Sequence, residues 1–219
     1  MPKSFESLKA FQREHRDKWG QGISLRIHRA LSWLKKAEFE RQHEDIDGEF
    51  IALWISFNAA YASEHNITIQ KSEREAYRDF FDRVINSDAD KRLYNVIWEQ
   101  YPTAIRSLMN NPYVFQPYWD YVNQQTVDNS WKDSFESAKK RANQALAEQD
   151  TVTSVSILMD RMYTLRNQVI HGGATYQGGM NREQLSDACR ILGAIAPVVI
   201  ELLMQNGTEV WGDAVYFEE

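Results

Sequence analysis

Residues 151–173, TVTSVSILMDRMYTLRNQVIHGG, carry the strongest helical signal in the chain. An α-helix turns about 100° per residue, so apolar side chains spaced three and four residues apart line up on one face. This spacing predicts a helix from Thr151 to His171 whose buried stripe consists of Val155, Leu158, Met162, Leu165 and Val169. Gly172 and Gly173 should end the helix, because glycine readily adopts the left-handed conformation found just past a helix C-terminus.

Helical spacing recurs through most of the remaining chain, and strict alternation of apolar and polar residues is nearly absent. Glycine and proline are also scarce, with 10 and 5 in 219 residues. We therefore predict an all-α protein, an antiparallel helical bundle with additional helices inserted. Further helices are expected over 21–43, 45–64 with Asp45 or Asp47 as N-cap, 72–86, 90–109 with a break at Pro102, 131–149 and 182–205.

The length of the chain, 219 residues and 25.6 kDa, suits one domain. No Gly/Ser-rich linker divides it, so residues 1–219 are interpreted as a single domain. Segment 65–130 is a possible helical insertion into a bundle whose core helices lie within 21–64 and 131–206. Pro112 and Pro117 bracket a connector within this segment that is rich in Tyr, Phe and Trp.

Composition limits the classes of protein to consider. The net charge is −6, so nucleic acid would have to bind at a local basic patch against a negative background. The single cysteine, Cys189, excludes an internal disulfide framework and a Cys-rich zinc site, and it suits a reducing cytosol. The N-terminus lacks an apolar signal core, and the longest apolar stretch, 191–204, is interrupted by Pro197 and Glu201. We expect a cytoplasmic protein with no membrane partner.

Arg166, Asn167 and His171 are the candidate catalytic residues. Arg166 lies roughly 60° from the centre of the apolar stripe, so its stem can pack while its guanidinium reaches outward. His171 lies opposite the stripe, and Asn167, one turn earlier on the same face, could orient the imidazole. Arg166 and His171 diverge by roughly 140° around one helix. A two-fold homodimer that packs these helix ends together would bring both residue types to one site.

This pair of side chains suits phosphodiester cleavage. An arginine fork neutralises charge on the phosphoryl oxygens, and a histidine transfers protons to and from the reacting oxygens. In RNA the internal 2′-hydroxyl can attack, so the reaction needs no metal. We therefore predict RNA as the partner. We also predict no cofactor, because no His, Cys, Asp or Glu residues show metal-ligand spacing.

Two further sets of residues are candidates for substrate binding. Asn58 is a polar residue on an otherwise aromatic helix face, so it is either a hydrogen-bonded buried amide or a contact to the Arg166/His171 site. Lys139, Lys140 and Arg141 form either a solvated helix face or a contact to RNA phosphates.

Several short motifs resemble one known family. Trp54, Asn58 and Tyr61 match a Trp-x-x-x-Asn-x-x-Tyr helix, and 165–173 match Leu-Arg-Asn-x-x-x-His-Gly-Gly. Asn181-Arg182 match a helix start in which Gln184 is shifted by one position, and Trp211-Gly212 match a closing pair. These blocks, scattered over about two thirds of the chain, are similar to the HEPN superfamily (higher eukaryotes and prokaryotes nucleotide-binding) and to bacterial Apea-like members. Residues 65–130 do not align.

The resemblance implies a metal-independent endoribonuclease that acts as a dimer, with Arg166 and His171 catalytic and Asn167 supporting. Many members are toxins or phage-defence effectors, which implies an antitoxin or a defence-system partner. Other members have lost catalysis and serve as modules that dimerise or bind a partner or nucleotide. The intact Arg166/His171 pair favours the enzyme, whereas the acidic net charge favours the binding module.

Overall fold

The computed structural model describes residues 3–62, 73–125, 129–206, 211 and 214. These residues form α-helices joined by short turns and contain no β-strand, which confirms the all-α class. The helices are α1 (Phe5–His15), α2 (Gln21–Gln42), α3 (Ile46–Tyr61), α5 (Glu73–Ser87), α6 (Arg92–Asn95), α7 (Pro102–Met109), α8 (Gln116–Val122), α9 (Ser130–Ala147), α10 (Thr151–Ile170) and α11 (Arg182–Asn206).

Local sequence explains where several helices begin. Of the two aspartates considered as N-cap, Asp45 caps α3 by accepting a hydrogen bond from the backbone N–H of Gly48 at 3.0 Å. Asp150 caps α10 in the same way through Thr153, also at 3.0 Å. Pro102 is the first residue of α7 and divides the predicted 90–109 helix, because proline has no N–H to donate to the preceding turn. Helices α1 and α8 were not predicted, and α8 lies within the segment interpreted as an aromatic connector.

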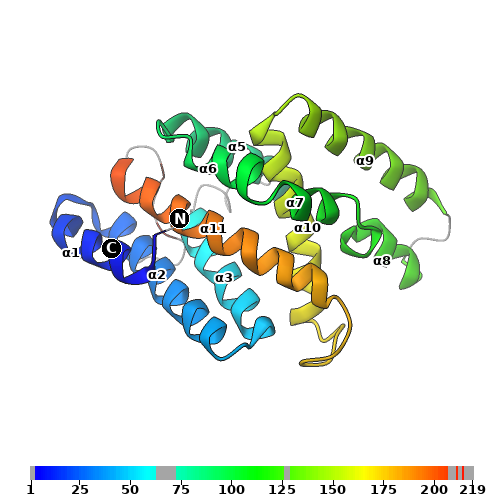
Figure 1. Ribbon diagram of the computed structural model, residues 1–219, viewed down its shortest axis with the longest axis horizontal. Helices are drawn as coiled ribbons and strands as arrows, with labels where there is room; N and C mark the ends of the chain where they lie inside the picture. The colour runs from blue at the N-terminus through cyan, green and yellow to red at the C-terminus, as the bar shows by residue number, and fades with distance from the viewer. Residues whose placement is uncertain (1–2, 63–72, 126–128, 207–210, 212–213, 215–219) are drawn as a thin grey trace.

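Helix α11 runs through the middle of the molecule, with α2 and α3 on one side and α10 and α7 on the other (Figure 1). It contributes more buried side chains than any other described helix. Its buried Glu201 pairs with Lys3 at 2.6 Å and with Arg92 at 2.9 Å, which ties the start of the chain and α6 to α11. Among the described helices, none is long and apolar enough to cross a membrane.

Aromatic side chains fill the core between α3 and α5. The ring of Phe57 stacks on that of Phe81 at 5.9 Å and meets the edge of Phe80 at 6.1 Å. Tyr61 and Tyr77 pack beside them with ring centroids 4.9 Å apart. Helices between residues 73 and 109 therefore bury side chains in the same hydrophobic cluster as α2, α3, α10 and α11.

Helix α9 lies at the outer edge of the bundle and packs along α10 (Figure 1). The buried face of α9 consists of Phe135 and three alanines, and Phe135 joins Phe115 in a second, smaller cluster. Buried Arg161 of α10 lies against these two rings, with its guanidinium carbon 4.5 Å from the Phe115 centroid and 6.0 Å from that of Phe135. This contact joins Phe115, the residue that precedes α8, to α9 and α10.

Candidate functional site

The C-terminal end of α10 has the geometry predicted from its sequence. Four residues of the predicted stripe are fully buried, and Val169 is partly buried against the same core. The helix ends at Ile170, and exposed His171 is its C-cap. Gly172 adopts a φ of 72°, and the N–H groups of Gly172 and Gly173 donate to the carbonyls of Val169 and Gln168. This paired pattern closes the helix and leaves His171 at its tip.

Arg166 is held by its sequence neighbour. Its NH1 donates to Oδ1 of Asn167 at 2.9 Å, and its guanidinium carbon lies 5.7 Å from the ring centroid of Tyr163. The Nε of Arg166 is buried and has no hydrogen-bond partner among the described residues. Asn167 was expected to orient the imidazole of His171, but its side-chain oxygen accepts from Arg166 instead, which fixes the direction of the guanidinium.

The loop 172–181 that follows His171 is anchored to the first turn of α3. The Tyr176 hydroxyl donates to Oδ2 of Asp45 at 3.0 Å, and the Gln177 N–H donates to Oδ2 of Asp47 at 3.2 Å. Arg182 donates to both oxygens of Asp47, at 2.8 and 2.5 Å. Hydrogen bonds from Arg182 lower the pKa of Asp47 below its ordinary value. The resemblance singles out Arg182, but nothing in the sequence indicates its pairing with Asp47.

Gln168 joins two other segments to the end of α10. Its Nε2 donates to the carbonyl oxygen of Tyr113 at 2.7 Å, and its Oε1 accepts from Asn181 at 2.6 Å. The aromatic connector and the loop 172–181 therefore meet beside Arg166 and His171. Sequence reasoning did not select Gln168, because a glutamine between two motif residues gives no signal of its own.

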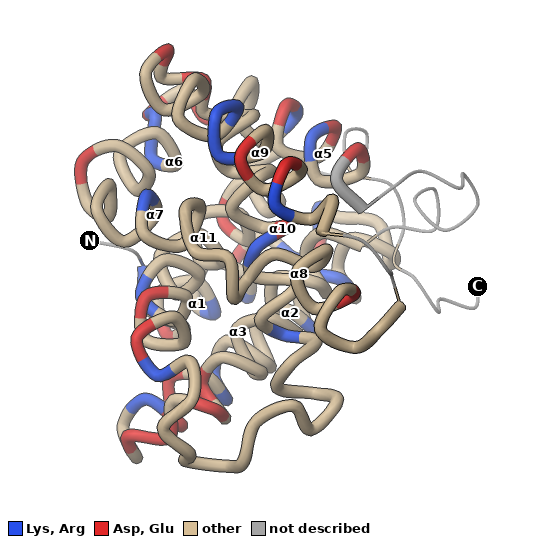
Figure 2. The backbone as a smooth tube through the Cα atoms, turned by 90° about the vertical axis from the view of Figure 1, so that its right-hand side faces the viewer, with Lys and Arg blue, Asp and Glu red and all other residues tan. Residues whose placement is uncertain are grey.

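The loop that follows His171 carries no charged side chain, and apolar side chains are exposed beside it. Loop 172–181 contains no Lys, Arg, Asp or Glu and is tan throughout in Figure 2. The large apolar side chains exposed near the end of α10 are Tyr113 (52%), Ile170 (45%), Tyr176 (67%) and Met180 (48%). They are four of the seven that the described part of the chain exposes, and such gathering is typical of an interaction surface.

The structure places Asn58 away from the end of α10. Asp47, at the start of α3, contacts the loop that follows the end of α10. Trp54, farther along α3, packs on Tyr163, which lies earlier in α10, with ring centroids 6.1 Å apart. Helices α3 and α10 therefore run in opposite directions. Asn58, half-buried, lies one turn farther from His171 than Trp54 does. Its contact with substrate stays a prediction.

Lys139, Lys140 and Arg141 lie on α9 beside the middle of α10. Lys140 and Arg141 are exposed, and Lys139 is 3.9 Å from Glu136. Arg141 and Asp160 line one cavity of about 520 Å³. Asp160 precedes His171 by eleven residues, roughly 16 Å along the helix. RNA bound at His171 would have to extend along α10 to reach these cations, and that contact also stays a prediction.

Neither a metal site among the described residues nor a comparison with known proteins gives further information on the site. Among the described residues, no three His, Cys, Asp or Glu side chains come together in a way that could hold a metal ion. No protein-family model matches the chain, and no curated protein or solved structure is detectably similar to it. The similarity to the HEPN superfamily therefore rests on the sequence motifs.

Proposed function

We propose that the protein is a metal-independent endoribonuclease of the HEPN type that acts in the cytoplasm. The observation that carries the proposal is the end of α10, where exposed His171 caps the helix and Asn167 directs the Arg166 guanidinium one turn earlier. An exposed imidazole can exchange protons with a bound substrate, and a guanidinium can neutralise a phosphoryl group.

In the proposed reaction His171 takes the proton from the 2′-hydroxyl of RNA. The 2′-oxygen forms a bond to the adjacent phosphorus while the bond from phosphorus to the 5′-oxygen breaks. Arg166 stabilises the charge that builds on the non-bridging oxygens. A proton returns to the leaving 5′-oxygen, which gives a 2′,3′-cyclic phosphate and a 5′-hydroxyl. DNA has no 2′-hydroxyl and should remain intact.

A two-fold homodimer would complete this site. Arg166 and His171 point in directions roughly 140° apart around α10, so a phosphate could be contacted by Arg166 of one protomer and His171 of the other. Burial of Ile170 and Met180 between protomers would stabilise the dimer and exclude water from the reacting groups. A toxin or phage-defence role, with an antitoxin or other defence-system partner, follows from the HEPN resemblance alone.

A non-catalytic module that dimerises and binds a partner or nucleotide is the second candidate. The uncharged loop 172–181 and the apolar side chains exposed near His171 favour it, because a protein partner could cover them as well as a second copy could. The net charge of −6 also disfavours binding to RNA.

Incubation of the purified protein with total RNA in EDTA separates the two candidates. We expect cleavage by the wild type, with cyclic phosphate ends and no cut in DNA of the same sequence. His171→Ala should be inactive, while His28→Ala, which removes an exposed histidine on α2, should retain activity. Cleavage that requires magnesium, or full activity of His171→Ala, would overturn the mechanism and favour the binding module.

A further inference from the structure

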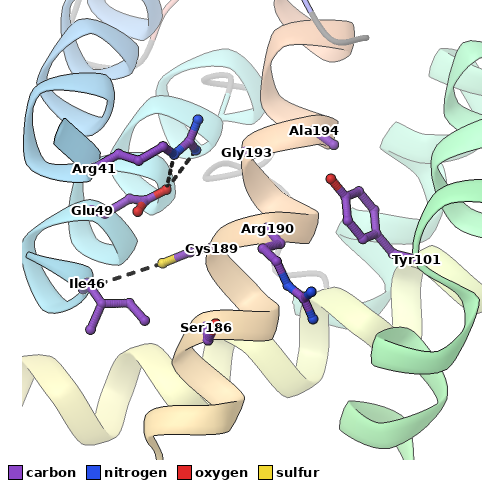
Figure 3. A pocket seen from close by; sticks show the side chains of 9 residues that line it. All are labelled: Arg41, Ile46, Glu49, Tyr101, Ser186, Cys189, Arg190, Gly193 and Ala194. Atoms are coloured by element: carbon purple, nitrogen blue, oxygen red, sulfur yellow. Dashed lines mark hydrogen bonds and ion pairs between the residues drawn. The ribbon is translucent and has the colours of Figure 1, made fainter. Parts of the chain in front are cut away.

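A cavity of about 370 Å³ lies over one face of α11, between the start of α3 and the side chain of Tyr101 (Figure 3). Its volume falls within the range of small-molecule sites. Its residues belong to α2, α3, α11 and the turn before α7, and none is part of the proposed catalytic site. We propose that this cavity binds a small organic anion, in which a phosphate or carboxylate is attached to a compact apolar group.

Two arginines of the cavity wall have unused hydrogen-bond donors. Arg41 directs its Nε and NH2 to the same oxygen of Glu49, at 2.7 and 2.6 Å, which leaves NH1 without a partner among the described residues. Arg190 pairs through NH2 with Asp187, which lies outside the cavity wall. The remaining N–H groups of both guanidiniums are therefore available to a ligand.

Two hydroxyl groups add to this excess of donors. The Tyr101 hydroxyl points across the cavity toward α11 near Ala194, and Ser186 lies lower on the same helix (Figure 3). Neither hydroxyl has a hydrogen bond within the described part of the chain. Glu49 is the one carboxylate in the wall, and it already receives two N–H groups from Arg41. An anionic group bound at one of the arginines would take up donors that the fold leaves free, and Ile46 and Ala194 offer apolar contact to the rest of the ligand.

Gly193 makes room for this arrangement. Glycine destabilises the interior of a helix relative to alanine, yet Gly193 lies in the middle of α11. A Cβ at this position would be 2.6 Å from NH2 of Arg41, so any side chain would displace the guanidinium from the cavity wall. Replacement by alanine should therefore weaken ligand binding.

Isothermal titration calorimetry with four probes tests the proposal. Phenyl phosphate and benzoate present the two anionic groups, inorganic phosphate lacks the apolar part, and phenol lacks the charge. We expect phenyl phosphate or benzoate to bind at one site per chain. The probe with the higher affinity identifies the preferred anionic group. Phenol and inorganic phosphate should each bind at least tenfold more weakly.

Variants localise the binding. Arg41→Gln and Gly193→Ala should weaken binding of the better probe at least tenfold, and Tyr101→Phe should weaken it severalfold. Thermal denaturation should show that every variant is still folded under the conditions of the titration, which separates lost binding from lost folding. Arg13→Gln, an exposed arginine on α1, is the matched control and should bind as the wild type does.

Absence of binding by the wild type up to 10 mM phenyl phosphate and benzoate would overturn the proposal. Unchanged affinity of a folded Gly193→Ala protein for the better probe would also overturn it. The same holds if Arg41→Gln and Arg13→Gln lose affinity for that probe equally. These outcomes do not depend on RNA cleavage, because no probe is a substrate for that reaction.

Discussion

The two polar regions on either side of loop 172–181 are held very differently. Asp47 receives hydrogen bonds from Gln177 and from both terminal nitrogens of Arg182. Arg166, by contrast, makes one side-chain hydrogen bond, to its own neighbour Asn167, and the His171 ring is exposed. A polar side chain whose hydrogen bonds are all made within the fold stabilises the structure. A polar side chain with unpaired donors or acceptors can hydrogen-bond to a ligand. Asp47 and Arg182 therefore anchor the loop, whereas Arg166 and His171 keep polar atoms free for the chemistry proposed above.

The largest effect is expected at His171. His171→Ala should lower RNA cleavage by roughly 10²–10⁴-fold, because proton transfer is lost. The free energy of unfolding should change by less than about 0.5 kcal/mol, since the side chain is exposed. Cleavage rates and urea denaturation of the same preparation measure both quantities. A large loss of stability would instead place His171 among the anchoring residues.

Arg166→Lys should lower cleavage by roughly 10- to 100-fold. Lysine keeps the positive charge but cannot contact two phosphoryl oxygens through a planar fork. Single-turnover rates at saturating RNA separate this effect from weaker binding. Activity equal to that of the wild type would show that only the charge of Arg166 matters.

Asp47→Asn should lower the free energy of unfolding by about 2 kcal/mol at pH 7, because charged hydrogen bonds to Arg182 are lost. Arg182 lowers the pKa of Asp47, so this stabilisation is fully present above the unfolded pKa of about 3.9 and disappears as pH falls through the folded pKa. Urea denaturation between pH 2 and 7 should show a steeper acid loss for the wild type than for Asp47→Asn. Parallel curves would contradict the anchoring role.

Ile170→Glu should weaken the homodimer by about tenfold. The side chain is half-exposed in the single chain, and burial of its apolar surface between protomers is worth about 1–2 kcal/mol, which the glutamate would lose. Sedimentation equilibrium at micromolar concentration measures the dissociation constant. Phe39→Glu, an equally exposed apolar position on α2, should leave it unchanged. A wild-type protein that is active as a strict monomer would exclude the composite site.

The smallest effect is expected on α9. Combined replacement of Lys139, Lys140 and Arg141 by glutamine should weaken RNA binding severalfold at low salt and hardly at all at high salt, because phosphate contacts are screened. Fluorescence anisotropy of labelled RNA with the His171→Ala protein measures binding without cleavage. An identical salt dependence in both proteins would show that these residues form a solvated helix face.

Periodicity predicted the helices well because burial of one face governs helix packing. The stripe on α10, the left-handed Gly172 and the break at Pro102 are all set by residues close together in sequence. The first helix, α1, was not predicted although Phe5 and Leu8 are buried. Its apolar face contains few residues, and charged residues separate them.

The candidate site was predicted only in part. Sequence selected Arg166 and His171 and placed His171 at the exposed tip of α10. It did not indicate the Asp47–Arg182 pair or the bridge made by Gln168, because these contacts join residues far apart in the chain. The sequence also did not indicate that Asn167 bonds to Arg166. The Asn167 side chain could have reached either Arg166 or His171, and helical spacing does not decide between them.

The single thiol has a practical consequence for any study of assembly. Cys189 is buried, donates to the carbonyl of Ile46 at 3.6 Å, and burial raises its pKa far above the usual range for a thiol. A buried thiol that stays protonated reacts slowly and is too enclosed to meet the thiol of a second copy. Any dimer of the natural chain is therefore held by non-covalent contacts. A cysteine introduced at Ile170 would be the one reactive thiol, ready for spin labels or cross-linkers that report the separation of the two helix ends.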